Sequence, residues 1–577
     1  MDSRSMTLKE EDLVDGPRSR ASTPNSQSKN SNPILNEKSD DLKVSLDSND
    51  ATANKESPSS GEDEDTNEYP DATRMIFIVI ALVLSIFLVS LDMTIVATAI
   101  PKITDEFRGL DLVGWYGAAF FLTVGSFQST WGKAYKYFPL KITFLVSIFI
   151  FELGSLICGV APSSTALIVG RAIAGLGGAG IASGAYTIIA FAARPRQRPA
   201  FTGLLGASYG IASVIGPLLG GVFAEKVTWR WCFYINLPIG GLAGAIILFL
   251  FQTPAASVPA KANLLEKILQ MDLPGTFTVM GSVICFILAL QWGGQSKAWG
   301  DSDVVGTLVG FVVLMIVFVI IEIYQGERAM VVPRLLKDRT NSVGMAFIFC
   351  LGGSFFVLLY YIPLYFQIVS DVSASQSGVR NLPLILGCTI ATILSGGLIS
   401  VYGHFVPFMI IGSVGGTIGA GLIYTLSPTS TSSEWIGYQA LAGLGLGFAL
   451  QIPVISAQGF ATPEDLSSVT AMILFAQTIG GAFYVSAGQS AFANRLLSRL
   501  PITAPSVDPV AVVSTGVTEL RNVFPADTIP GIVAANMAGL KVAYAIAIAS
   551  VGASVFIAVL SPYPWKSLRG VKITGAA

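Results

Sequence analysis

The stretch "GASYGIASVIGPLLGG", from Gly206 to Gly221, lies inside an apolar segment long enough to cross a bilayer. It contains five glycines and one proline and carries no charge. Gly and Pro are the poorest helix formers, but in membranes small residues let helix backbones approach closely and a proline bends its helix. The stretch therefore predicts a bent, tightly packed membrane helix. The alternative is a packing helix with no role in gating.

The composition of the whole chain favours a membrane protein. Of its 577 residues, 52% are hydrophobic and only 12% are charged, whereas soluble domains carry about 25% charged residues. The five cysteines lie in or beside apolar runs without the spacing of metal ligands, and they are interpreted as small core residues. Because His404 is the single histidine, we expect no metal site, no catalytic triad and no cofactor.

The charged residues are distributed unevenly along the chain. Residues 1–73 hold 17 acidic and 8 basic side chains and are rich in Ser, Asn and Pro, whereas the rest of the chain holds 27 basic and 20 acidic residues. Such a composition predicts a disordered acidic tail, and the absence of an apolar core in it excludes a signal peptide.

Apolar windows of about 18 or more residues predict roughly fourteen membrane-spanning helices in an all-α fold. The predicted spans are 75–100, 113–133, 142–161, 164–191, 201–224, 233–251, 273–292, 303–324, 343–368, 380–402, 406–427, 436–457, 464–488 and 542–561. Basic residues cluster between spans 2 and 3, 4 and 5, 8 and 9, and after the last span. The positive-inside rule then predicts that both termini are cytoplasmic and that the long segment 489–541 is extracellular.

An internal repeat suggests how these spans are grouped. The sequences "AIAGLGGAG" (Ala172–Gly180) and "ALAGLGLGF" (Ala440–Phe448) lie eight spans apart, as expected for two parallel halves of a transporter. The predicted organisation is a cytoplasmic tail (1–73), a six-helix bundle (74–252), a linker with two extra membrane helices (253–340), a second six-helix bundle (341–565) and a cytoplasmic C-terminal tail (566–577).

The same stretch contains a misleading pattern, since Gly175, Gly177 and Gly180 spell the dinucleotide fingerprint G-x-G-x-x-G. That fingerprint needs a preceding strand and a βαβ unit, whereas these glycines lie inside a spanning helix and predict close helix packing. The sequence has no G-x-x-x-x-G-K-[ST] motif, so we expect no ATP-driven motor. We also expect no nucleic-acid partner.

Several ordered motifs resemble the major facilitator superfamily over about residues 75–565. "GASYGIASVIGPLLGG" is similar to the antiporter motif of span 5, and "LDMTIVATAIP" (Leu91–Pro101) to the span 1 motif of the fourteen-span drug:proton antiporters. "LIVGRAIAGLGGAG" (Leu167–Gly180) is similar to the span 4 motif with its arginine, Arg171. The other motifs that resemble this group, and above all fungal toxin and multidrug efflux pumps, are "WRWCFYINLPIGG" (229–241), "LALQWGG" (288–294), "YYIPLYFQ" (360–367) and "SGVRNLPLILG" (377–387).

The loop between spans 2 and 3 departs from the family pattern Gly-x-x-x-Asp-Arg-x-Gly-Arg-Lys. It reads "GKAYKYFPLK", and Lys136 stands where the family has its acidic residue. The charge-relay latch that the family assigns to this loop is therefore in doubt for this chain.

Charged residues inside membrane spans are expensive and are functional candidates by default. Asp92 in span 1 and Arg171 in span 4 lie about the same number of residues from the outer ends of their helices, which permits an ion pair. Glu152 in span 3 should lie near the midplane, and we expect Asp92 or Glu152 to bind a proton whose release Arg171 biases. A fixed structural pair is the alternative. Asp272 and Glu322 fall near span ends and are expected to meet water or headgroups.

Two further sets of residues are candidates. The antiporter motif comprises Gly206, Gly210, Gly216, Pro217, Gly220 and Gly221. The polar and aromatic residues expected to line a substrate cavity are Tyr360, Tyr361, Tyr365, Gln367, Gln451 and Gln477.

The resemblance implies a secondary transporter that exports a hydrophobic small molecule, such as a secondary metabolite, toxin or drug, in exchange for protons. We expect it to be a multi-pass protein of the cell membrane, with a vacuolar or vesicle membrane as the alternative. Proton-coupled uptake of a siderophore or amino acid is the second interpretation. A polytopic membrane enzyme is the third, but it would need clustered acids, histidines or metal ligands at a membrane face.

Overall fold

A computed structural model describes residues 69–107, 113–254, 257–515, 519–562 and 565–568. The predicted acidic tail therefore lies outside the described residues except for its last five, and so does most of the predicted C-terminal tail. The described residues form helices, turns and two isolated bridges, without a named strand.

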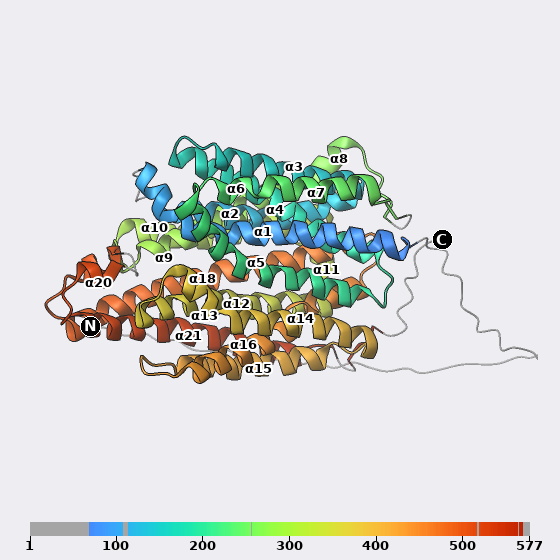
Figure 1. The fold of residues 1–577 in the computed structure, drawn as a ribbon. Coiled ribbons are helices and arrows are strands. Elements are labelled where there is room, and N and C mark those ends of the chain that lie inside the picture. Colours follow the sequence, from blue (N-terminus) through green and yellow to red (C-terminus); the bar gives the residue numbers. More distant parts are fainter. Residues whose placement is uncertain (1–68, 108–112, 255–256, 516–518, 563–564, 569–577) are drawn as a thin grey trace, which may run out of the picture. The chain divides into compact units, whose positions relative to one another are not determined.

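Fourteen long helical segments run through these residues (Figure 1). They are α1 (Ala72–Phe107), α2 (Val113–Tyr137), α3 (Leu140–Gly159), α4 (Ser164–Ala192), α5 (Arg198–Lys226), α6 with α7 (Trp231–Tyr234, Asn236–Leu250), α9 (Leu273–Trp292), α10 (Ser302–Gln325), α12 (Arg339–Ser370), α14 (Leu382–Tyr402), α15 (Val406–Tyr424), α16 with α17 (Ser432–Leu450, Ile452–Phe460), α18 (Leu466–Thr503) and α21 (Ile529–Val559). Thirteen are long and apolar enough to cross a membrane. The exception is α2, which is long enough but carries Ser126, Gln128, Ser129 and Lys133. The predicted all-α fold of about fourteen helices is confirmed.

Both described ends of the chain lie at the same end of the helices. Arg74, at the start of α1, donates a hydrogen bond to Gln252, just after α7. Lys566 donates to Thr340 at the start of α12. We call this the basic end, because the Lys- and Arg-rich loops of the sequence lie there.

Two helices extend further than hydropathy predicts. The last helices were expected to stop at residue 488 and to resume at 542, but α18 continues to Thr503 and α21 begins at Ile529. Leu496 and Leu500 of α18 pack against Ile529 and Ile532 of α21 in a separate apolar cluster. The two helices pack on each other, and a hydropathy window does not register this packing. The segment between them is therefore residues 504–528 and not 489–541 as predicted.

The glycine-rich repeat has the same packing role in both halves. A Cβ on Gly175 of α4 would collide with the backbone of Phe120 in α2, and one on Gly443 of α16 would collide with the backbone of Leu384 in α14. Likewise, Gly177 abuts α3 and Gly445 abuts α15. The G-x-G-x-x-G pattern is therefore a helix-packing surface, and the matched neighbours support two halves built on one plan.

The two halves meet through a few helices. Helix α5 packs against α1 in its own half and against α14 in the other, and α2 packs against α18. The additional helices α9 and α10 pack on each other, and α9 contacts both α2 and α18. In Figure 1 the long helices of residues 69–568 run alongside one another, so side chains far apart in sequence meet between them.

Candidate functional site

An ion pair between Asp92 of α1 and Arg171 of α4 lies in the interior of the N-terminal half. Both side chains are 0% exposed, and the guanidinium donates to the carboxylate. Arg171 Nε also donates to the backbone oxygen of Tyr116 over 2.8 Å, and the guanidinium carbon lies 4.4 Å from the centre of the Phe120 ring. The equal depths inferred from the sequence are thus matched by a direct contact.

Helix α7 closes this site from the other side. Asn236 Nδ2 donates to Asp92 Oδ1 over 3.3 Å and to Ser155 Oγ over 3.0 Å. One turn further along α7, a Cβ on Gly240 would collide with the carboxylate of Glu152, which lies one turn before Ser155 on α3. We call these five residues, Asp92, Glu152, Ser155, Arg171 and Asn236, the N-half polar site.

The two carboxylates of this site differ in their surroundings. Asp92 is held by a guanidinium and an amide, whereas both oxygens of Glu152 are buried without a hydrogen-bond partner among the described residues. Because a buried polar group without a partner is costly, a proton on Glu152 would remove a charge that no donor compensates. The site therefore contains one paired acid and one acid without a hydrogen-bond partner among the described residues.

Sequence reasoning identified Asp92, Glu152 and Arg171 but missed Asn236 and Ser155. The available signal was a buried amide in the apolar span "WRWCFYINLPIGG", since polar side chains at membrane depth usually bind a partner. The partner itself could not be read from the sequence, because it depends on how α7 is rotated against α1 and α3.

Helix α5 makes the close approaches that its glycines predict. A Cβ on Gly216 would collide with Thr94 of α1, and one on Gly210 would collide with Thr389 of α14. On Gly206 it would lie 2.5 Å from Nε2 of Gln451. Helix α5 is therefore fitted closely to both halves.

Three other residues of the antiporter motif complete this helix. Pro217 lies inside α5, and Gly220 is buried. Gly221 differs from the packing glycines, because a Cβ there would meet nothing within 4 Å. Close packing therefore does not account for Gly221.

The candidate cavity residues are found in three kinds of surroundings. Tyr360 of α12 is 55% exposed. Its neighbour Tyr361 is buried beside Phe492, and Tyr365 donates to the backbone oxygen of Ser427 over 2.8 Å. Both of these tyrosines therefore pack inside the C-terminal half.

The three glutamines lie at helix contacts. Gln367 Nε2 donates to Ser377 Oγ over 2.9 Å. Gln451 is 3% exposed and faces α5. Gln477 of α18 lies against Gly352 of α12. Their contact with a substrate stays a prediction.

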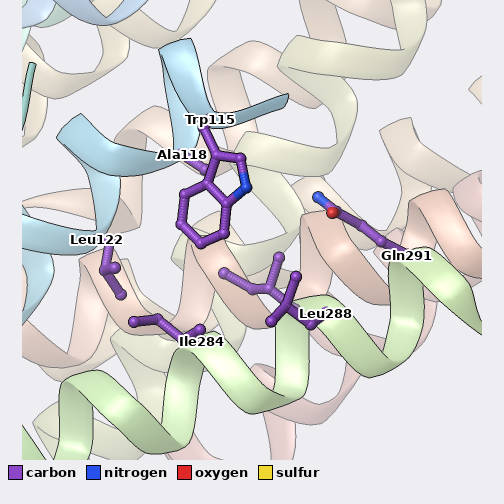
Figure 2. A pocket seen from close by; sticks show the side chains of 7 residues that line it. Trp115, Ala118, Leu122, Ile284, Leu288 and Gln291 are labelled. Atoms are coloured by element: carbon purple, nitrogen blue, oxygen red, sulfur yellow. The ribbon is translucent and has the colours of Figure 1, made fainter. Parts of the chain in front are cut away.

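A small cavity lies between α2 and α9 (Figure 2). Trp115, Ala118 and Leu122 line it from α2, and Ile284, Leu288 and Gln291 face them from α9. Its volume of about 10 Å³ is no more than one water molecule requires. It is too small for an organic substrate.

Lys136, the residue that departs from the family pattern, pairs with an acid of the other half. Its Nζ lies 3.1 Å from Asp465 Oδ1, in the loop between α17 and α18, and Arg334 Nη1 lies 2.9 Å from Asp465 Oδ2. Burial alone would raise the pKa of Asp465, but hydrogen bonds and charge from Arg334 and Lys136 outweigh it and lower that pKa. A carboxyl with a lowered pKa stabilises the folded state above its unfolded-state pKa and loses that effect as the pH falls through its folded pKa. The link between the halves therefore persists at neutral pH.

Reversing the charges of this pair should reveal its coupling. Lys136→Asp and Asp465→Lys should each weaken transport and stability, because each places like charges together. The double variant should recover part of the loss, with a coupling energy of roughly 0.5–3 kcal/mol. Melting temperatures and transport rates of the four proteins measure this. Additive losses would show that the two side chains do not act as a pair.

Comparison with known proteins shows one consistent relationship. The sequence profile of the Major Facilitator Superfamily matches residues 82–485. The MFS-type transporter grgE of Penicillium sp is 53% identical over 515 residues, which cover 89% of this chain and 91% of that protein. The probable efflux pump gsfJ of Penicillium aethiopicum is 50% identical over 503 residues, which cover 87% of this chain and 90% of that protein. The MFS-type efflux pump MFS1 of Arthroderma benhamiae is 43% identical over 516 residues, which cover 89% of this chain and 96% of that protein.

Solved structures of low sequence identity share the fold. The human organic anion transporter MFSD10 superposes with a TM-score of 0.53 at 13% identity, over 84% of this chain and 99% of that one. The proton:xylose symporter XylE gives a TM-score of 0.53 at 11% identity, over 84% and 95%.

Proposed function

The chain belongs to the major facilitator superfamily, and we propose that it exports a hydrophobic small molecule in exchange for protons. The observation that carries this proposal is the N-half polar site, where a buried ion pair lies beside an acid without a partner. Several curated relatives are described as efflux pumps, and their names denote transport rather than catalysis. The glycine contacts of α5 also support exchange, because a helix fitted closely to both halves leaves little room for water to leak between them.

In the proposed cycle one of the two acids binds the coupling proton, and Asp92 is the first candidate and Glu152 the second. Arg171 biases the release of this proton by competing for the carboxylate of Asp92. The proton and the substrate would then compete for the same inward-open state. The two are therefore carried in opposite directions across the membrane. The free energy of the proton gradient drives the substrate outward.

Transport assays in intact cells test this proposal. A panel of fluorescent compounds and fungal metabolites is offered to cells that express the protein, with and without a protonophore. Export predicts lower accumulation than in control cells, and the protonophore should abolish the difference. Higher accumulation that depends on the gradient would indicate uptake instead, and no effect of the gradient would contradict proton coupling.

We further propose that the basic end faces the cytoplasm, as the positive-inside rule requires. A tag at the N-terminus and a tag within residues 504–528 should then be labelled on opposite sides of the membrane. In intact cells only the second tag should react with an impermeant reagent. Labelling of both tags, or of neither, would contradict this topology.

A further inference from the structure

Two acids at the basic ends of the additional helices are buried, contrary to the expectation that they meet water or headgroups. Asp272, which precedes α9, is 0% exposed, and Glu322, in the last turn of α10, is 6% exposed. The segment 326–331 after α10 folds back over them, so that Met330 is also buried. Because burying a charge is costly, the partners of the two carboxyl groups decide their state.

Asp272 has the surroundings of a carboxylate. It caps α9 by accepting a hydrogen bond from the backbone N–H of Gly275 over 2.9 Å. It also accepts from the backbone N–H of Met330 over 2.8 Å and from the side chain of Gln325. Its φ of +45° is a left-handed conformation, which is uncommon for a residue other than glycine. Two backbone N–H groups and one side-chain amide thus donate to it.

Glu322 has only one donor for its two oxygens. Its Oε2 accepts from the backbone N–H of Val331 over 2.7 Å, whereas Oε1 has no donor among the described residues. The carboxyl group of Glu322 lies beside that of Asp272. A Cβ on Gly275 would lie 2.5 Å from Asp272 Oδ2 and 2.7 Å from Glu322 Oε1, so the two oxygens approach the same point. Two carboxylates so placed would repel each other.

We propose that Asp272 and Glu322 form a second proton-binding site, in which a proton on Glu322 Oε1 is donated to Asp272 Oδ2. The proton supplies the donor that Glu322 Oε1 lacks and leaves one negative charge on the pair. Buried carboxyl groups that face each other commonly share a proton in this way. The site is built from the additional helices and is separate from the N-half polar site.

The charges around the pair match a single negative charge. Lys133 of α2 is buried and donates to the backbone oxygen of Glu327, and its ammonium group interacts with both Asp272 and Glu322. The other charged groups that act on Lys133 are Lys136 and the carboxylate of Glu327. One buried cation thus balances a pair that carries one proton, whereas loss of the proton would leave a second, uncompensated negative charge.

The pair is connected to the contact between the halves. Its backbone donors, Met330 and Val331, belong to the same segment as Glu327, whose carboxylate pairs with Arg334 over 2.8 Å. Arg334 in turn pairs with Asp465, the partner of Lys136. Loss of the proton should therefore loosen the segment 326–331 and, through Arg334, weaken the link between the two halves.

Infrared spectroscopy of the full-length protein in nanodiscs tests the proposal directly. A C=O band of a protonated carboxylic acid that belongs to Glu322 should be present at neutral pH and should be lost in Glu322→Gln, whose amide replaces the proton donor. In Asp272→Asn, the band of Glu322 should shift, because the acceptor of its proton has changed. Glu152→Gln is the matched control, since it removes another acid whose carboxyl oxygens are buried and should leave the band of Glu322 in place.

Thermal unfolding supplies an independent measurement. The melting temperature of the wild type should fall from mildly acidic to mildly alkaline pH, and Glu322→Gln should lose a distinct part of that fall. Asp303→Asn, a change at an exposed acid, should keep the wild-type pH dependence. An unchanged carboxylic-acid band in Glu322→Gln, or a pH dependence equal to that of the wild type, would overturn the proposal. Neither measurement requires transport, so a failure of the proposed function would be detected separately.

Discussion

Replacing Gly216 with leucine should abolish export while the protein still reaches the membrane. A Cβ at this position would collide with Thr94 Oγ1 and lie 3.2 Å from the backbone nitrogen of Ile95. The hydrogen bond that Thr94 donates to the backbone oxygen of Ala212 over 3.4 Å lies in the same contact. Overpacking of this kind costs typically 1–3 kcal/mol, and here it would separate α5 from α1. Efflux in cells and the amount of protein at the membrane are measured together.

The same helix provides a matched control. Gly221→Leu makes the identical change five residues further along, where a Cβ would meet nothing within 4 Å. We expect this variant to export at close to the wild-type rate. Normal export by Gly216→Leu would contradict the requirement for close packing, and equal loss in both variants would indicate that any leucine in this helix is harmful.

Breaking the buried ion pair should have the second large effect. Arg171→Ala leaves the carboxylate of Asp92 buried with only Asn236 as a donor, and removing one partner of a buried pair costs about 3–5 kcal/mol. Asp92→Asn keeps the size and shape of the side chain but leaves the guanidinium of Arg171 without its counter-charge. We expect Arg171→Ala to lose most of its folded protein, and Asp92→Asn to reach the membrane without gradient-driven export. Substrate-coupled proton movement, recorded across pH, measures the second effect.

An exposed ion pair serves as the control for stability. Glu106→Gln breaks the ion pair between Glu106 and Arg230, whose side chains are both partly exposed. In this pair Arg230 Nη2 lies 2.9 Å from Glu106 Oε1. Pairs of this kind contribute about 0–1 kcal/mol, so the variant should melt close to the wild type.

If Asp92→Asn and Glu152→Gln both keep wild-type gradient-driven export, neither acid carries the coupling proton.

Much of the fold could be predicted because hydropathy and small residues act locally. Thirteen of the fourteen long helices are apolar enough to follow from hydropathy windows, and the close approaches of α5 follow from its glycines. Counting residues from helix ends also placed Asp92 and Arg171 at one depth, because rise per residue is nearly constant in a helix. Where the helices pack beyond the expected spans, as at Leu496 and Ile529, the prediction of their ends was wrong.

The parts that could not be predicted depend on helix rotation and on long-range contacts. Asp465 is separated from Lys136 by more than three hundred residues, and nothing in either local sequence indicates the other. Asp272 and Glu322 looked like interfacial acids, and only the return of residues 326–331 buries them. The rotation of α12 turns Tyr361 inward while Tyr360 next to it stays exposed, a difference that their identical side chains do not reveal.

Helix α9 is attached to both halves of the protein, which has a mechanical consequence. Toward the basic end, Thr276 of α9 shares a hydrogen bond of 2.8 Å with Thr130 of α2. Toward the other end, Phe286 stacks on Phe483 of α18 with ring centres 4.3 Å apart, and Asn494 donates to the backbone oxygen of Gly293. Because α9 also packs against α2 and α18 elsewhere along its length, a rocking motion of the halves must shift α9 against at least one of the two helices. The weaker of these two contacts would then determine how far the halves separate.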